Sequence, residues 1–216
     1  MGASRKIIDL RQLLKERFPV SRLSAAAHLA TGLSTLDIAT EGGLAKGAIT
    51  ELSSPNLSAG SALLLYQLLH VATRDRYFVA LVDGRDSFAP SGAGPTRLRH
   101  LLWIRCAKAF DAVKAADLLL RDGNFPLVVL DLVLNPAEEL RKIPATTWYR
   151  LQRLVEPTST AFLVLTRRSM IGSAQWKLVL ENSWRIPDLE RDDNCPRLQF
   201  QVQRLHRGRH EVAETG

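Results

Sequence analysis

Cysteine and long apolar runs are the two features that this sequence most plainly lacks. Only Cys106 and Cys195 are cysteines, and no CxxC pair occurs, so the sequence predicts free thiols rather than a disulfide framework. No apolar run approaches the roughly 18 residues of a membrane span. Charges interrupt the apolar positions of residues 1–18, so a signal-peptide core is missing. These absences predict a cytoplasmic protein that does not enter a membrane.

Acidic residues are the minority among the charges. Lysine and arginine number 29 against 22 aspartates and glutamates, which leaves a formal charge of +7 and a pI near 9.8. This balance favours a nucleic acid, a membrane surface or an acidic protein as partner, and it carries no information about the fold. With 216 residues, 46% of them hydrophobic, the chain can bury the core of one α/β domain without metals or disulfides.

The N-terminal segment has the pattern of an amphipathic helix. Ile7, Leu10 and Leu14 recur at i, i+3 and i+7, among six basic and two acidic residues. We therefore divide the chain into a helical arm at 1–24 and a core with a basic C-terminal tail at 25–216. The apolar stripe predicts that the arm contacts a partner or a second copy of the chain, so a homo-oligomer is one expected state.

The core alternates apolar strands with helices. Continuous apolar strands separated by helices predict a mainly parallel sheet that is covered on both faces. The alternating run LQFQVQRL at 198–205, together with WRI at 184–186, predicts antiparallel strands added at one edge. The expected strands are 48–52, 77–82, 101–105, 126–132 and 161–165, and the expected helices are 61–73, 108–121 and 145–155.

The loop between the first strand and the first helix occupies the position of a Walker A phosphate-binding loop, whose pattern is GxxxxGK[ST]. Ser54 replaces the first glycine, Ala59 the second and Gly60 the lysine, while Ser61 keeps the hydroxyl. The loop has no other positive side chain, so the phosphates of a nucleotide lose their main cationic contact. The pattern therefore favours a structural strand–loop–helix over a functional nucleotide site.

No other catalytic or metal-binding arrangement is evident. Asp131 ends an apolar strand, as the Walker B carboxylate does, but a strand-end aspartate is a weak signal without the lysine. The GxSxG glycines of a nucleophile elbow are absent. We expect no catalytic residue, no metal and no cofactor, because the histidines lack the spacing of ligands; they are His28, His70, His100, His206 and His210.

Two linked motifs resemble the start of the ATPase core of RecA recombinases. TGLSTLDIA at 31–39 and EGGLAKGAITE at 41–51 follow the order found there, a TG pair, S-x-LD-IA, GGL-x-x-G and a short strand that leads into the P-loop. The resemblance continues through AFLVLT at 161–166 and covers roughly residues 31–205. It implies a RecA-like α/β fold with a mainly parallel sheet flanked by helices.

The sequence departs from RecA at three functional positions. Gly60 replaces the P-loop lysine, and Arg85 stands at or near the catalytic glutamate that follows the next strand. RecA carries a longer loop after the strand that ends at Leu165, and that loop contacts single-stranded DNA; here only RRSMIGS at 167–173 remains. The resemblance therefore implies a RecA-like scaffold that has lost ATP cleavage and strand exchange.

These features resemble the ImuA family, the RecA-like accessory proteins of the bacterial ImuA–ImuB mutagenesis cassette. LLWIR at 101–105, the degenerate P-loop and the basic strand with a glycine turn at 198–208 match the pattern of that family. The resemblance implies a non-catalytic role in SOS-induced translesion DNA synthesis. The implied partners are an ImuB-like Y-family polymerase homologue, an error-prone replicative-type polymerase and RecA, with weak DNA binding left open.

Two other functions remain open at the level of the sequence. SulA, a cell-division inhibitor that binds FtsZ, is likewise a RecA-like fold without ATPase function, and a RecA-type ATPase with an unusual P-loop is the other alternative. Trp148 and Tyr149 lie among basic residues, but aromatic packing on the sheet is favoured over a DNA-stacking surface. The candidate contacts to DNA or a partner are Arg167, Arg168, Arg204, Arg207 and Arg209.

Overall fold

The computed structural model describes residues 27–57, 59–184 and 197–205. The predicted arm lies outside the described residues, and with it the stripe of Ile7, Leu10 and Leu14. Arg207 and Arg209 lie outside them as well, and so does the side chain of Arg204.

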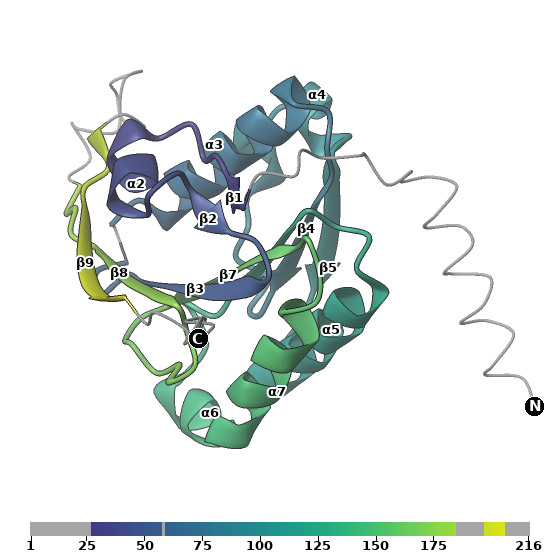
Figure 1. Ribbon diagram of the computed structural model, residues 1–216. Helices are drawn as coiled ribbons and strands as arrows, with labels where there is room; N and C mark the ends of the chain where they lie inside the picture. Colours follow the sequence, from purple (N-terminus) through teal and green to yellow (C-terminus); the bar gives the residue numbers. More distant parts are fainter. Residues whose placement is uncertain (1–26, 58, 185–196, 206–216) are drawn as a thin grey trace, which may run out of the picture.

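A seven-stranded sheet, in the order β5-β4-β6-β7-β3-β8-β9, forms the centre of the molecule (Figure 1). Six neighbouring strands, from β5 to β8, run parallel, and β9 pairs antiparallel with β8 at the C-terminal edge. The fold class predicted from the sequence is therefore confirmed. The strands are β3 (Ala48–Ser53), β4 (Val79–Asp83), β5 (Leu101–Arg105), β6 (Leu127–Asp131), β7 (Ala161–Thr166), β8 (Trp176–Leu180) and β9 (Phe200–Leu205).

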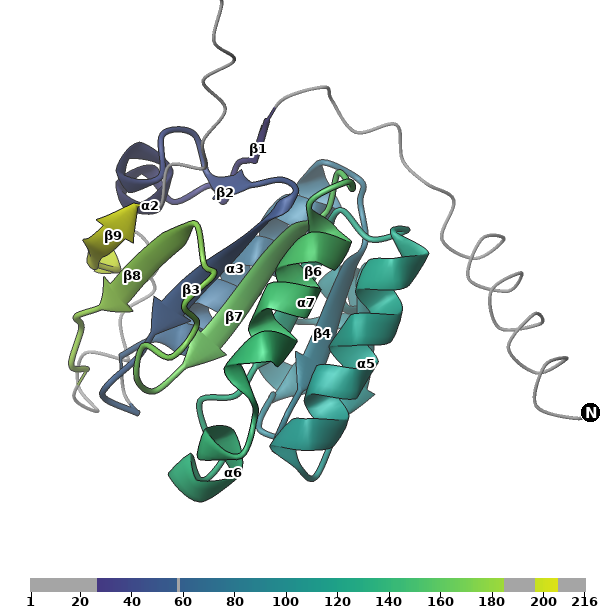
Figure 2. The ribbon, with the colours of Figure 1, turned by 60° about the horizontal axis from the view of Figure 1, so that its bottom comes forward.

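Helices cover both faces of the sheet, with α5 and α7 side by side on one face and α3 on the other (Figure 2). In β7, Leu163 and Leu165 pack with the residues of α3, while Phe162 and Val164 pack with those of α5 and α7. Because successive side chains of a strand point to opposite faces, a continuous apolar strand supplies both layers of the core. The helices are α2 (Ser34–Ala39), α3 (Ser61–Arg74), α4 (Pro95–Leu98), α5 (Ala109–Asp122), α6 (Ala137–Arg141) and α7 (Ala145–Val155).

The TG and LD motifs have a structural role ahead of the first sheet strand. The Asp37 carboxylate accepts hydrogen bonds from the Thr31 amide at 2.9 Å, the Thr31 hydroxyl at 2.6 Å and the Gly32 amide at 3.2 Å. The short strands β1 (His28–Leu29) and β2 (Leu44–Ala45) pair antiparallel and hold the two ends of the same segment together. Gly43 is required there, because its φ is +118° and a Cβ would lie 2.3 Å from the Leu29 carbonyl oxygen.

Most of the predicted elements occur within one or two residues of their expected bounds. The main omission is β8, at Trp176–Leu180, because Lys177 interrupts its apolar residues and leaves a continuous apolar run of only 178–180. Of the predicted strand at 184–186, Trp184 is outside any strand, and residues 185 and 186 lie outside the described residues. Within the described ranges, no helix is both long and apolar enough to cross a membrane.

Candidate functional site at the carboxyl ends of the parallel strands

The loops that follow β3, β4, β6 and β7 meet at one edge of the sheet, because these four strands are parallel. In open parallel sheets this edge is where ligands bind. The degenerate Walker A loop follows β3, Asp131 ends β6, and Arg167 and Arg168 follow β7. The topology therefore places the main sequence-predicted site residues along one side of the molecule.

Apolar side chains occupy the space beside the position of the missing lysine. Gly60 begins α3 with a φ of +101°, and a Cβ built there would lie 2.7 Å from Leu198 Cδ2 and 2.9 Å from Trp184 Nε1. Ala59 and Leu198 are both fully buried in the core cluster beneath α3. A side chain at position 60 therefore requires Trp184 and Leu198, which lie between β8 and β9, to move.

The other predicted loop residues serve the turn itself. The Ser54 amide donates to the Thr166 carbonyl at 2.7 Å, and the Ser54 hydroxyl donates to the Asn56 carbonyl at 3.2 Å. These bonds tie the start of the loop to the end of β7. Ser61 is half-buried as the first residue of α3. Of the four predicted loop residues, Ala59 is therefore part of the core and Gly60 lies against it.

Asp131 forms a buried carboxylate pair with Asp83, its register partner on β4. Asp83 accepts hydrogen bonds from the amides of Ser87 and Phe88, both at 2.8 Å, and so closes the turn after β4. Asp131 accepts from the Val133 amide at 3.0 Å. Burial, with a smaller contribution from the negative charge of Asp83, raises the pKa of Asp131 to about 6.

This pKa predicts that Asp131→Asn stabilises the protein at pH 7.5. Protonation favours the folded state, because the pKa of Asp131 is about 6 there against an ordinary value of 3.8. The free energy of unfolding therefore falls as pH rises from about 4 to about 6. Removing the charge should raise it at pH 7.5 by up to about 3 kcal/mol, and the gain should vanish below about pH 4. Urea unfolding across this range tests the prediction, and a pH-independent effect would contradict it.

Arg85 is held away from the β3 loop. Its guanidinium donates to the Ala107 carbonyl at 2.8 Å and lies 3.7 Å from Glu139 Oε1. Beside it, Arg105 pairs with Asp86 through two hydrogen bonds and lies 5.0 Å from the centre of the Trp103 ring. This arrangement lowers the pKa of Asp86, chiefly through its hydrogen bonds to Arg105. The cations at the ends of β4 and β5 therefore already have carboxylate partners.

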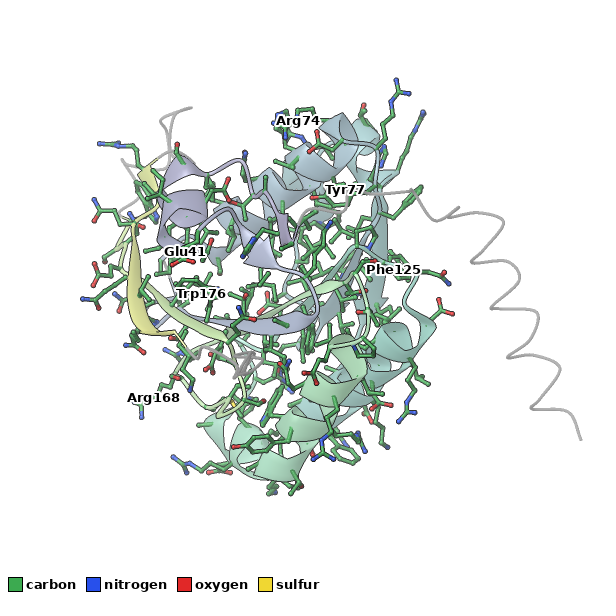
Figure 3. All side chains as sticks on the ribbon, in the orientation of Figure 1. Glu41, Arg74, Tyr77, Phe125, Arg168 and Trp176 are labelled. Carbon is green, nitrogen blue, oxygen red and sulfur yellow. The ribbon has the colours of Figure 1, made fainter. Side chains whose placement is uncertain are left out.

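A groove of about 570 Å³ opens between α6, the end of β6 and the loop after β7. Arg167 and Arg168 line it, as exposed residues, and Arg168 projects from the surface below the sheet in Figure 3. Arg141, at the end of α6, is the third cation of the groove, and sequence reasoning missed it because 26 residues separate it from Arg167. The remaining lining residues are Pro55, Leu134, Asn135, Pro136, Ala137, Leu140 and Met170.

A buried glutamate holds the loop that carries Arg167 and Arg168. Glu51, fully buried in β3, accepts hydrogen bonds from the Met170 amide at 2.6 Å, the Ile171 amide at 3.2 Å and the Ser169 hydroxyl at 3.0 Å. Lys177 Nζ lies 3.3 Å from its Oε2. The sequence pattern did not lead us to predict the pairing of Glu51 with Lys177. The available signal was a single charged residue inside each of two mostly apolar strands.

The aromatic pair on α7 is divided between core and surface. Trp148 is 2% exposed and packs on the sheet, as predicted, whereas Tyr149 is 54% exposed, so the prediction is wrong for Tyr149. Successive residues of a helix point about 100° apart, so one of two neighbours faces solvent. Within the described part of the chain, no group of three or more histidine, cysteine, aspartate or glutamate side chains is placed to hold a metal.

Comparison with known proteins points to RecA. No family model matches the chain. RecA from Acinetobacter baumannii is 31% identical over 123 residues, which are 55% of this chain and 35% of that protein. RecA from Nostoc sp. is 29% identical over 116 residues, 52% of this chain and 32% of that protein. The chloroplastic DNA repair protein recA homolog 1 of Arabidopsis thaliana is 30% identical over 130 residues, 56% of this chain and 29% of that protein.

The matches therefore span about a third of the length of these relatives. The chain has distant, partial sequence similarity to RecA proteins.

Proposed function

We propose that this protein is a non-catalytic, RecA-like accessory factor of SOS-induced, error-prone translesion DNA synthesis, of the ImuA type. It acts in the cytoplasm through contacts with an ImuB-like protein, an error-prone polymerase or RecA. Similarity to RecA and to a DNA repair protein supports a place in DNA repair. The motifs LLWIR and GGL-x-x-G, together with the altered P-loop, support the narrower assignment.

The surroundings of Gly60 are the observation that carries the non-catalytic part of the proposal. The residue at this position has no side chain to bind phosphate, and a Cβ there would lie 2.7 Å from Leu198 Cδ2 and 2.9 Å from Trp184 Nε1, so both side chains would have to move. A charged contact to a phosphate is worth about 1.5–3 kcal/mol, so its loss weakens nucleotide binding roughly tenfold to a hundredfold. Arg85, near the predicted position of the catalytic acid, is positively charged and bound elsewhere.

We expect isothermal titration calorimetry with Mg-ATP to show no micromolar binding, and turnover assays to show no ATP hydrolysis. Ser61→Ala is the matched control, because it removes the one Walker A side chain that the chain retains. Turnover above that of Ser61→Ala would instead favour the degenerate RecA-type ATPase.

A pull-down tests the partners. We expect the full chain to retain ImuB-like and RecA-like proteins without added ATP, and to retain FtsZ no better than a column without bait does. Repeating the binding step at two salt concentrations measures a DNA contribution from the basic tail, because contacts of arginine to phosphate weaken with salt. Binding to FtsZ alone would favour the SulA-like alternative.

A further inference from the structure

The groove beside α6 brings three unpaired arginines together. Arg141, Arg167 and Arg168 are exposed, and no carboxylate of the described residues pairs with any of them. Among the other arginines whose side chains the structure describes, five have carboxylate partners, namely Arg74, Arg85, Arg105, Arg121 and Arg150, and five do not, namely Arg76, Arg97, Arg99, Arg153 and Arg197. Three unpaired guanidinium groups around one groove create a local positive potential that attracts an anionic ligand.

No acidic residue of the described part of the chain lines this groove. Glu139, on α6, accepts hydrogen bonds from the Ala109 amide at 3.0 Å and from the Asn135 side chain at 3.4 Å, and it faces Arg85. Glu138 is exposed and is not part of the lining. The described lining residues therefore carry charge of one sign only.

The rest of the lining is mostly apolar. Leu134, which is 46% exposed, lines the groove together with Leu140, Met170, Pro55 and Pro136. A half-exposed leucine inside a groove gains free energy when a ligand covers it with apolar atoms. The ligand that fits should therefore combine negative charge with at least one apolar side chain.

The absence of aromatic residues decides between a nucleic acid and a peptide. Proteins that bind single strands stack bases on aromatic side chains, and none of the ten lining residues that the structure describes is aromatic. Hydrogen bonds also hold the groove walls in place. The Glu51 carboxylate accepts from the Met170 amide at 2.6 Å, and the Asn135 side chain donates to the Gly84 carbonyl at 2.9 Å. A preformed groove of this kind reduces the entropy lost when a flexible peptide binds.

We propose that this groove is the docking site for an acidic segment of a partner protein, with one or two apolar side chains seated on Leu134 and Met170. Arg141, Arg167 and Arg168 bind the carboxylates of that segment through charge-assisted hydrogen bonds. The inference rests on the proposed function in one respect only, that the protein acts through protein contacts. It specifies which surface of this chain binds a partner and which chemical features the bound segment has.

The test uses the full chain and a phage-displayed library of random peptides of about twelve residues. Selections run in parallel on the wild type, on Arg141→Glu/Arg168→Glu and on Arg99→Glu. Arg99 is the matched control, because it is exposed and unpaired within the described residues and follows α4 at the other end of the sheet. Circular dichroism melting confirms that each variant is folded.

We expect the wild type and Arg99→Glu to enrich peptides of net negative charge that contain leucine, isoleucine, phenylalanine or methionine. A synthetic, fluorescently labelled copy of the most enriched peptide should lose at least tenfold in affinity to Arg141→Glu/Arg168→Glu, because each reversed charge repels a carboxylate. Enrichment of neutral or basic peptides, no enrichment, or equal binding to the double variant would overturn the proposal. Displacement of the peptide by an oligothymidylate of about 20 nucleotides, itself dependent on both arginines, would assign the groove to nucleic acid instead.

The outcome is separable from that of the partner pull-down. If the chain retains neither ImuB nor RecA but still selects acidic peptides through the arginines, the proposed function fails and the groove stands. If it retains ImuB or RecA and selects no acidic peptide, the function stands and the groove proposal fails.

Discussion

Gly60→Lys, which restores the lysine of a Walker A loop, should destabilise the protein and leave it without ATP hydrolysis. The φ of +101° at this position costs a residue with a side chain about 1–2 kcal/mol, and the clash with Leu198 and Trp184 adds the cost of overpacking, about 1–3 kcal/mol. We expect the free energy of unfolding to fall by about 3 kcal/mol, measured by urea unfolding.

Gly123→Lys separates the two costs. Gly123 also has a positive φ, +67°, but nothing lies within 4 Å of the Cβ that would be added there. This variant should therefore lose only about 1–2 kcal/mol. If Gly60→Lys is no less stable than Gly123→Lys and binds Mg-ATP at micromolar concentration, Leu198 and Trp184 do not close the site.

A second large effect is expected from Glu51→Ala. This substitution leaves Lys177, whose side chain is 14% exposed, beside an empty space, and it deprives the amides of Met170 and Ile171 of their acceptor. Removing one partner of a buried ion pair typically costs about 3–5 kcal/mol. We expect a loss of this size in the free energy of unfolding.

Hydrogen exchange shows whether the loss is local to the loop. The amides of Met170 and Ile171 should lose protection in Glu51→Ala well before the strand amides of β6, which do not bond to Glu51. Combining Glu51→Ala with Lys177→Met should cost less than the sum of the two single changes, because the two residues interact directly. Glu138→Ala, at an exposed residue, is the control and should change stability by less than about 0.5 kcal/mol. Unchanged protection at Met170 would show that Glu51 does not hold the loop.

Local sequence pattern was enough to predict the architecture. Five mostly apolar strands and three long helices form close to where periodicity placed them, because a strand buried on both faces is mostly apolar and a helix needs an apolar stripe. Local pattern also revealed the altered P-loop, since the residue types at Ser54, Ala59 and Gly60 are visible without a structure. It failed for β8, where Lys177 interrupts the apolar run in order to reach Glu51.

The features that give the site its character were decided by the tertiary structure. Glu51 accepts a hydrogen bond from the Met170 amide, 119 positions later in the sequence. Leu198, between β8 and β9, lies against Gly60. Arg141 joins Arg167 and Arg168 only because β6 and β7 are parallel neighbours whose following loops lie at the same edge. The residue types alone show which Walker A side chains are missing from the loop after β3. Which side chains fill that space, and which arginines gather in a groove, depends on strand order, and strand order is set by long-range pairing that no local pattern encodes.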